Sequence, residues 1–231
     1  MVKERIDPYR ETNFLVKSYG IRRYRLAKGF ISKNKRRLIL DVGCGTGFGM
    51  VILKNSSEII GIDCSVDAVQ YGRENYGHEK ANFLVADAHH LPFRDSLFDC
   101  VLCLEVIEHV KSPDIVISEV RRVLRPKGSL VLSTPNAKTP TGNPFHLKEF
   151  SYQELLDFIE QFGFEISFSR GILVRYGWMV YAIFDKLLHS FCSRLCQKSA
   201  RILLGWLSEF LVRISFFSPA RSFLYFWWRI K

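Results

Sequence analysis

Residues 40–49, with the sequence LDVGCGTGFG, place a glycine-rich turn directly between a predicted buried strand and a predicted helix. Glycine allows a sharp turn at such a junction and lets the backbone approach a ligand where any Cβ atom would collide. The spacing is G-x-G-x-G, and Phe48 stands where the third glycine of a dinucleotide fingerprint would fall. The turn therefore predicts a small-molecule site in an α/β domain, and its spacing disfavours a dinucleotide.

Two acidic residues follow the next two predicted strands and narrow the choice of ligand. Asp63 comes after the strand expected at residues 58–62, where a carboxylate can accept both hydroxyls of a ribose. Asp87 follows the strand expected at residues 82–85 and is placed to accept from an adenine amino group. The turn carries no Lys or Arg to meet a pyrophosphate. An adenosine ligand with a cationic head therefore fits this region better than NAD.

Short apolar runs alternate with helical stretches from residue 38 onward, which is typical of a parallel sheet with crossover helices. The runs expected to form strands are residues 38–42, 58–62, 82–85, 98–104, 129–133 and 164–169. Most are apolar throughout, as in strands that are covered on both faces. Helices are expected over residues 67–75, 113–124 and 151–162, the last with a capping box at its start. The pattern predicts a doubly wound α/β domain.

Taken together, these segments resemble the motifs of the class I S-adenosylmethionine-dependent methyltransferases. The resemblance covers about residues 36–170, in the family's order, and rests on residues 40–49, 61–63, 86–88, 98–99 and 124–129. It implies a Rossmann-like sheet of seven strands, mostly parallel, with a reversed last strand. It also implies methyl transfer from the sulfonium of S-adenosylmethionine, in which alignment of the reacting groups supplies much of the rate.

The same resemblance implies cofactor contacts for eight residues, which are Asp41, Gly43, Gly45, Gly47, Asp63, Asp87, Ala88 and Leu104. The glycines would line the methionine part of the cofactor, with the aspartate before them near its ammonium group. Asp63 would bind the ribose, and Asp87 and the backbone of Ala88 would bind the adenine. Leu104 would close over the cofactor.

The segment from Glu105 to His109, with the sequence EVIEH, directly follows the fourth expected strand. If it is helical, Glu105, Glu108 and His109 share one face. Two carboxylates and an imidazole suit Mg²⁺ or Mn²⁺, and His146 could supply a fourth ligand. The block resembles the Glu-x-x-Glu-His motif of ubiquinone-biosynthesis O-methyltransferases and of small-RNA 2′-O-methyltransferases, which implies a divalent cation beside the acceptor hydroxyl.

Two other interpretations of this segment stay open. One is a metal-free polar acceptor site in which Glu105, His109 and His146 take part in catalysis, with either histidine as the general base. The other is a purely structural role.

The net charge of +10 on the 231 residues is concentrated at the two ends of the chain. Residues 1–37 carry +9 and are expected to form a basic helical leader, and residues 171–231 carry +7. Residues 38–170, the expected cofactor-binding core, carry −6, which is the wrong sign for a surface that tracks phosphates. Nucleic acid is therefore disfavoured as a partner.

Residues 171–218 are expected to be a helical, aromatic-rich insertion before a final core strand at residues 219–231. Basic residues fall on one side of its helical pattern and apolar residues on another. A lid over the acceptor and a helix that lies in a membrane interface would both show this pattern. Either interpretation favours an apolar or lipid-like acceptor.

The cysteines form no zinc pattern, because the CxxC of Cys100 and Cys103 lies inside an apolar run. Buried thiols in a reducing compartment are expected. We therefore expect a cytoplasmic methyltransferase, free or peripheral to the inner face of a membrane, that acts on a small apolar acceptor, with O-methylation favoured. The alternatives are an RNA 2′-O-methyltransferase and a non-catalytic cofactor-binding subunit.

Overall fold

The computed structural model describes residues 14–31, 38–53, 58–138, 143–173 and 222–230. The elements in chain order are α1 (Phe14–Ile31), β1 (Leu38–Val42), α2 (Phe48–Leu53), β2 (Glu58–Asp63), α3 (Val66–Tyr76), β3 (Ala81–Val85), β4 (Phe98–Leu104), α4 (Pro113–Val123), β5 (Leu124–Pro135), α5 (Tyr152–Glu160), β6 (Phe164–Leu173) and β7 (Ser222–Ile230). Every helix in these segments is too short or too polar to cross a membrane.

The strands form one sheet in the order β3-β2-β1-β4-β5-β7-β6. The strands from β3 to β5 pair in parallel, whereas β7 runs antiparallel to both of its neighbours. The prediction of a mostly parallel, Rossmann-like sheet is confirmed. The order reverses at β1, which has β2 on one side and β4 on the other. Ligands of such sheets bind beyond the carboxyl ends of the strands at this point of reversal.

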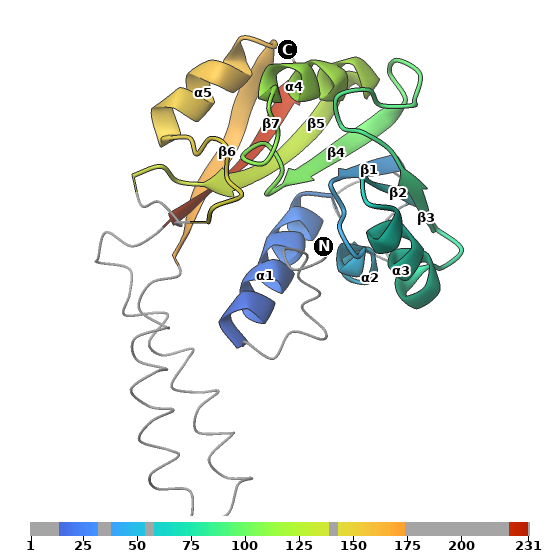
Figure 1. Cartoon of the computed structure of the whole chain (residues 1–231). Helices are drawn as coiled ribbons and strands as arrows, with labels where there is room; N and C mark the ends of the chain where they lie inside the picture. The colour runs from blue at the N-terminus through green and yellow to red at the C-terminus, as the bar shows by residue number, and fades with distance from the viewer. Residues whose placement is uncertain (1–13, 32–37, 54–57, 139–142, 174–221, 231) are drawn as a thin grey trace, which may run out of the picture.

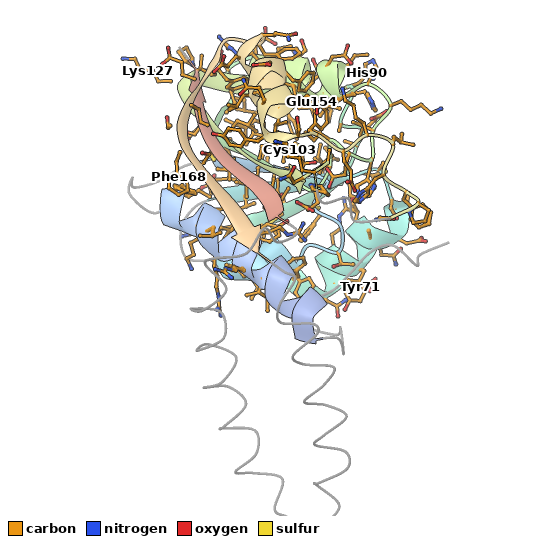
Figure 2. All side chains as sticks on the ribbon, turned by 90° about the vertical axis from the view of Figure 1, so that its left-hand side faces the viewer. Tyr71, His90, Cys103, Lys127, Glu154 and Phe168 are labelled. Carbon is orange, nitrogen blue, oxygen red and sulfur yellow. The ribbon has the colours of Figure 1, made fainter. Side chains whose placement is uncertain are left out.

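Helices cover both faces of the sheet, with α4 and α5 on one face and α1, α2 and α3 on the other (Figure 1). Successive strand residues face opposite layers. Leu40 therefore packs in the core under α4 and α5, while Ile39 packs in the core under α1 and α2. Cys100 and Cys103 divide in the same way, and both thiols are buried, as the sequence predicted; Figure 2 labels Cys103. Cys64 is exposed, so the expectation of a buried thiol is wrong at that position.

Local signals explain where several helices begin. In α5, the Oγ atom of Ser151 accepts from the backbone N–H of Glu154, and the Glu154 carboxylate accepts from the backbone N–H of Ser151, which completes the predicted capping box. Pro113 occupies the first turn of α4, where its missing N–H costs nothing. The helical part of the leader is α1, whose Phe30 ring lies 5.2 Å from that of Phe168 on β6.

Two predicted strands are several residues longer in the structure than expected. β5 starts at Leu124 rather than at residue 129, because Leu124 pairs with Phe98 ahead of a register shift in the ladder. β6 continues to Leu173, since its pairing with β7 extends beyond residue 169, so residues 171–173 are strand and not insertion. The rest of the expected insertion, residues 1–13 and 32–37 of the leader, and Cys192 and Cys196 lie outside the described residues.

Candidate functional site

The glycine-rich turn after β1 is tightly packed at two of its glycines and open at the third. A Cβ atom at Gly43 would lie 2.5 Å from Cγ2 of Val106, and one at Gly47 would overlap the ring of Phe83. Gly45 has a φ of +56°, and a Cβ atom there would meet no atom within 4 Å. The open side at Gly45 is therefore where the turn can receive a ligand.

Asp63, at the end of β2, holds this turn in place by hydrogen bonding. Its Oδ2 atom accepts from the backbone N–H of Gly45 at 2.9 Å, and its Oδ1 atom accepts from the backbone N–H of Ser65 at 2.9 Å. A carboxylate oxygen can accept more than one hydrogen bond. The same carboxylate can therefore hold the turn and also accept the hydroxyls of a ligand.

Asp41 lies on β1, two residues before the turn, and is only 1% exposed. The hydroxyl of Tyr24 donates to its Oδ2 atom at 2.8 Å, whereas its buried Oδ1 atom has no hydrogen-bond partner in the described part of the chain. Burial raises the pKa of Asp41 to about 7, against the lowering effect of the Tyr24 hydrogen bond. The buried Oδ1 atom of Asp41 is therefore suited to accept a hydrogen bond from a cationic group.

The remaining predicted cofactor residues follow the neighbouring strands. Asp87 comes after β3 with a side chain that is 61% exposed, and its Oδ1 atom lies 2.7 Å from Nδ1 of His89. Hydrogen bonds from the backbone and the ring of His89 lower the pKa of Asp87. Ala88 is half-buried, and Leu104 is buried at the end of β4. Because these strands are parallel, their carboxyl ends meet at one edge of the sheet.

The EVIEH segment is not helical, and this corrects the expected geometry of the metal site. Glu105 has a φ of +59°, and its backbone N–H donates to Ser133 O at 2.9 Å, which continues the pairing of β4 with β5. Its Oε1 atom accepts from Ser133 Oγ at 2.8 Å, and its Oε2 atom lies 3.4 Å from a guanidinium nitrogen of Arg23. Glu105 therefore faces α1 and β5 and is not grouped with Glu108 and His109.

Glu108, His109 and His146 form the cluster instead, with one potential ligand atom from each residue within 4.8 Å of the others. Thr134 Oγ1 donates to Glu108 Oε2 at 3.1 Å, while the buried Oε1 atom has no hydrogen-bond partner among the residues described. Burial raises the pKa of Glu108. The cluster thus offers one buried carboxylate oxygen and two imidazoles.

The hydrogen bonds of His146 determine which ring nitrogen carries the proton. Asn143 Oδ1 accepts from the backbone N–H of Phe145, so its amide nitrogen faces Nε2 of His146 at 3.0 Å. Nδ1 of His146 lies 2.7 Å from Glu149 Oε1. The pattern assigns the proton to Nδ1, with a lone pair at Nε2. Glu149 therefore holds the His146 ring in this tautomer and orientation.

Backbone contacts fix the loop that carries His146 against the EVIEH turn. Leu147 N–H donates to Glu108 O at 2.7 Å, and Nδ1 of His109 lies 3.2 Å from Phe145 O. Phe145 and Leu147, on either side of His146, are 54% and 59% exposed. A fixed loop therefore presents two apolar side chains to solvent beside a polar cluster.

Sequence reasoning gave no role to several of these partners, namely Ser133, Thr134, Asn143 and Glu149, and it treated Arg23 only as one of the basic residues of the leader. Arg23 and Tyr24 lie on α1, and both face the site because Tyr24, Ala27 and Ile31 form the buried side of that helix. That spacing of apolar residues was a usable signal. Ser133 and Thr134 lie on β5, whereas Asn143 and Glu149 lie on the loop that carries His146, so these contacts depend on tertiary structure.

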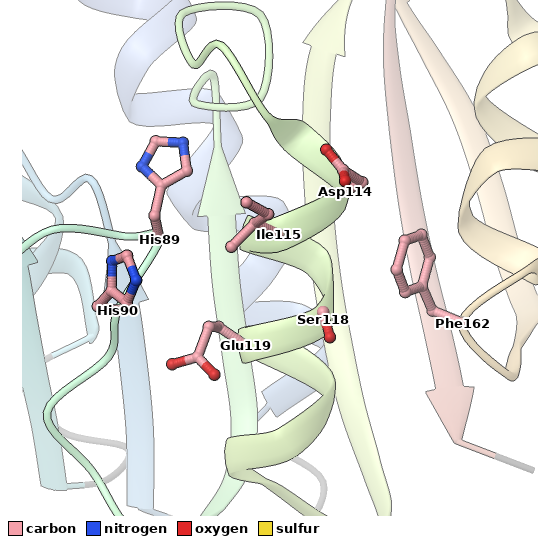
Figure 3. Close-up of a pocket in the computed structure, with 7 residues that line it drawn as sticks. All are labelled: His89, His90, Asp114, Ile115, Ser118, Glu119 and Phe162. Atoms are coloured by element: carbon pink, nitrogen blue, oxygen red, sulfur yellow. The ribbon is translucent and has the colours of Figure 1, made fainter.

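A pocket of about 550 Å³ lies elsewhere, over the outer side of α4 (Figure 3). His89 and His90 bound it on one side and Phe162 on the other, with Ile115 and Glu119 between them. It shares no lining residue with the glycine turn or with the Glu108 cluster. Glu119 is already paired with Arg122. We therefore assign the candidate site to the sheet edge rather than to this pocket.

Comparison with known proteins shows which family the segment around the glycine turn resembles. Residues 40–132 match a family model described as a methyltransferase domain. A protein of Mycolicibacterium smegmatis named "Probable S-adenosylmethionine-dependent methyltransferase" is 34% identical over 149 residues, which cover 59% of this chain and 55% of that protein. The O-methyltransferase cnsE of Penicillium expansum is 35% identical over 101 residues, covering 41% of this chain and 37% of its own.

The fold also has relatives among solved structures. The crystal structure of the cyclase SpnF superposes with a TM-score of 0.67 and 23% identity, covering 93% of this chain and 82% of that one. At this identity the likeness concerns the fold alone. This chain spans little more than half the length of the M. smegmatis relative.

Proposed function

We propose that this chain, whose residues 40–132 match a methyltransferase domain, is a class I S-adenosylmethionine-dependent methyltransferase that transfers the methyl group to a hydroxyl of a small apolar acceptor. The observation that carries the proposal is the buried Oδ1 atom of Asp41, which lacks a partner among the described residues and lies two positions before the open glycine turn. A cofactor with an ammonium group would satisfy this oxygen.

The other parts of the cofactor have matching groups. The carboxylate of Asp63 would accept the ribose hydroxyls while it holds the turn through Gly45. The amino-acid end of the cofactor also carries a carboxylate, and Arg23 is the cation whose charge acts on Asp41. We infer that Arg23 would pair with that carboxylate and Asp41 with the ammonium group, which places opposite charges in contact at both positions.

When bound, S-adenosylmethionine supplies an electrophilic methyl group: the acceptor oxygen forms a bond to the methyl carbon, the carbon–sulfur bond breaks, and S-adenosylhomocysteine leaves. The hydroxyl proton must be accepted during this step. The Nε2 lone pair of His146 would accept it in place of the hydrogen bond from the Asn143 amide, and Glu149 behind Nδ1 would stabilise the resulting imidazolium.

The acceptor class follows from the surroundings of that base. Phe145 and Leu147 expose apolar surface from a fixed loop on either side of His146. Fixed and exposed apolar side chains beside a polar cluster are typical of a recognition surface. The O-methyltransferase among the relatives supports transfer to oxygen.

The same cluster would hold a divalent cation through Glu108, His109 and His146, and the unpartnered Oε1 atom of Glu108 fits such a ligand. Two imidazoles and one carboxylate make a less oxygen-rich set than the sequence predicted, and this favours Mn²⁺ over Mg²⁺. A cation there would lower the pKa of an acceptor hydroxyl. Metal titration separates this role of His146 from that of a metal-free base.

Calorimetric titration of S-adenosylhomocysteine tests the cofactor assignment. Asp63→Ala should abolish measurable binding, whereas Asp67→Ala, a nearby exposed carboxylate, should bind as the wild type does. Transfer of a radiolabelled methyl group to a panel of hydroxyl-bearing apolar compounds then tests the reaction. A folded wild-type protein that binds neither S-adenosylmethionine nor S-adenosylhomocysteine would overturn the assignment.

A further inference from the structure

We propose that Tyr24 is a positioning residue for the ammonium group of the cofactor, because its hydroxyl occupies one oxygen of Asp41 and leaves the other for the ligand. This inference rests on the proposed function and goes beyond it, since it gives a residue of α1 a defined part in recognising the amino-acid end of the cofactor.

The hydrogen bond between the two residues is buried at both ends. The Tyr24 hydroxyl donates to Asp41 Oδ2 over 2.8 Å, with Tyr24 4% and Asp41 1% exposed. A carboxylate buried to this degree normally has both oxygens satisfied. Here Oδ1 has no hydrogen-bond partner in the described part of the chain. Among the described residues, one oxygen of the Asp41 carboxylate therefore has a hydrogen-bond donor, and the other oxygen still lacks one.

Packing, and not the hydrogen bond alone, fixes the position of the Tyr24 hydroxyl. Its ring meets the ring of Phe48 edge to face, with centroids 5.0 Å apart and planes at 80°. A side chain at Gly49 would overlap the Tyr24 ring. Ala27 and Ile31, further along the same side of α1, are fully buried. A hydroxyl held by this packing needs no reorganisation when the ligand binds.

The charges around Asp41 show what the hydroxyl contributes. Burial raises the pKa of Asp41, the charge of Asp63 raises it further, and the Tyr24 hydrogen bond and Arg23 lower it. The thiol of Cys103, on β4, is protonated because burial raises its pKa. Burial also raises the pKa of Tyr24, so its hydroxyl remains a donor throughout the neutral range. Loss of the hydroxyl would make the ionised carboxylate, which an ammonium group requires, harder to form.

The test compares two ligands on two variants. Tyr24→Phe keeps the ring and its packing but removes the hydroxyl, and Tyr152→Phe, whose hydroxyl lies 3.2 Å from Ser169 Oγ, is the matched control. The ligands are S-adenosylhomocysteine and its analogue with hydrogen in place of the α-amino group. We expect Tyr24→Phe to weaken binding of S-adenosylhomocysteine about tenfold, as for one charged hydrogen bond. Binding of the deamino analogue should change by less than about twofold, and Tyr152→Phe should change neither.

Several results would overturn the inference. Equal weakening of both ligands would mean that Tyr24 only supports the fold, and unchanged or tighter binding of S-adenosylhomocysteine would mean that its hydroxyl does not help. A second measurement uses Asp41→Asn, in which removal of the Tyr24 hydroxyl should have no further effect on the ratio of the two affinities. If the folded wild type binds neither ligand, the proposed function fails first, which is a distinct outcome.

Discussion

A side chain at Gly49 would occupy the space of the Tyr24 ring, so the absence of a side chain at this position of α2 allows α1 to pack against the glycine turn. At position 49 the lack of a side chain is therefore needed for packing, whereas at position 45 it leaves space where a ligand can approach the backbone. This packing also joins α1 to Asp41 through the Tyr24 hydroxyl. Helix α1 thus contributes Arg23 and Tyr24 to the candidate site, although it lies outside the segment that matches the methyltransferase family model.

Gly49→Ala should lower the free energy of unfolding by about 1–3 kcal/mol, the usual cost of overpacking. It should also weaken S-adenosylhomocysteine binding, because the Tyr24 ring must move. Gly29→Ala is the control, since a Cβ atom at this position of α1 meets nothing within 4 Å. That substitution should raise stability by up to about 1 kcal/mol, because alanine favours a helix over glycine. Urea unfolding measures both effects, and equal effects of the two substitutions would contradict the packing role.

Cofactor affinity should depend on pH through Asp41, whose pKa burial raises to about 7. Only the ionised carboxylate can pair with an ammonium group, so below this pKa binding must release a proton. The affinity should therefore increase with pH by about tenfold between pH 6 and pH 8, most of it below the pKa. Calorimetry at the two pH values measures the change. Asp41→Asn should bind more weakly with a flat profile, and an affinity that falls as pH rises would exclude Asp41 as the partner.

The sheet and the glycine turn could be predicted from the sequence because their signals are local. Short apolar runs marked the strands, and the spacing of the glycines and Asp63 marked the turn that the hydrogen bond from Gly45 to Asp63 now closes. The capping box at Ser151 was similarly local. The capping box depends on residues three positions apart, and each strand and the glycine turn are marked by a short continuous segment of sequence.

The side-chain partners in the site could not be predicted in this way. The positive φ of Glu105 depends on backbone pairing with Ser133, 28 residues away along the chain, and no local pattern indicates it. The contact between Tyr24 and Asp41 likewise joins a helix to a strand across the layers of the fold. The sequence therefore suggested four ligands, three from the Glu-x-x-Glu-His block and His146, and the structure groups all of them except Glu105.

The composition of the cluster predicts how metal binding should respond to substitution. His146→Ala or Glu108→Gln should weaken Mn²⁺ binding at least about tenfold, the usual range for loss of one ligand or its support. Glu105→Gln should have little effect, because Glu105 contacts Ser133 and Arg23 instead. Electron paramagnetic resonance of free Mn²⁺ during titration measures the affinities. Loss of binding in Glu105→Gln alone would restore the geometry expected from the sequence, and no binding by the wild type would leave His146 as a metal-free base.

The two exposed apolar residues beside His146 predict the response of the acceptor side. Phe145→Ser and Leu147→Ser should each raise KM for an apolar acceptor by about tenfold, because each removes apolar surface worth about 1–2 kcal/mol on burial. Neither should change S-adenosylhomocysteine affinity or thermal stability by much, since the two side chains are 54% and 59% exposed in the protein alone. Ile115→Ser, which removes a comparably exposed side chain from α4, is the control. Steady-state kinetics with one acceptor of the panel measures the effect, and an unchanged KM in both loop variants would mean that the acceptor binds elsewhere.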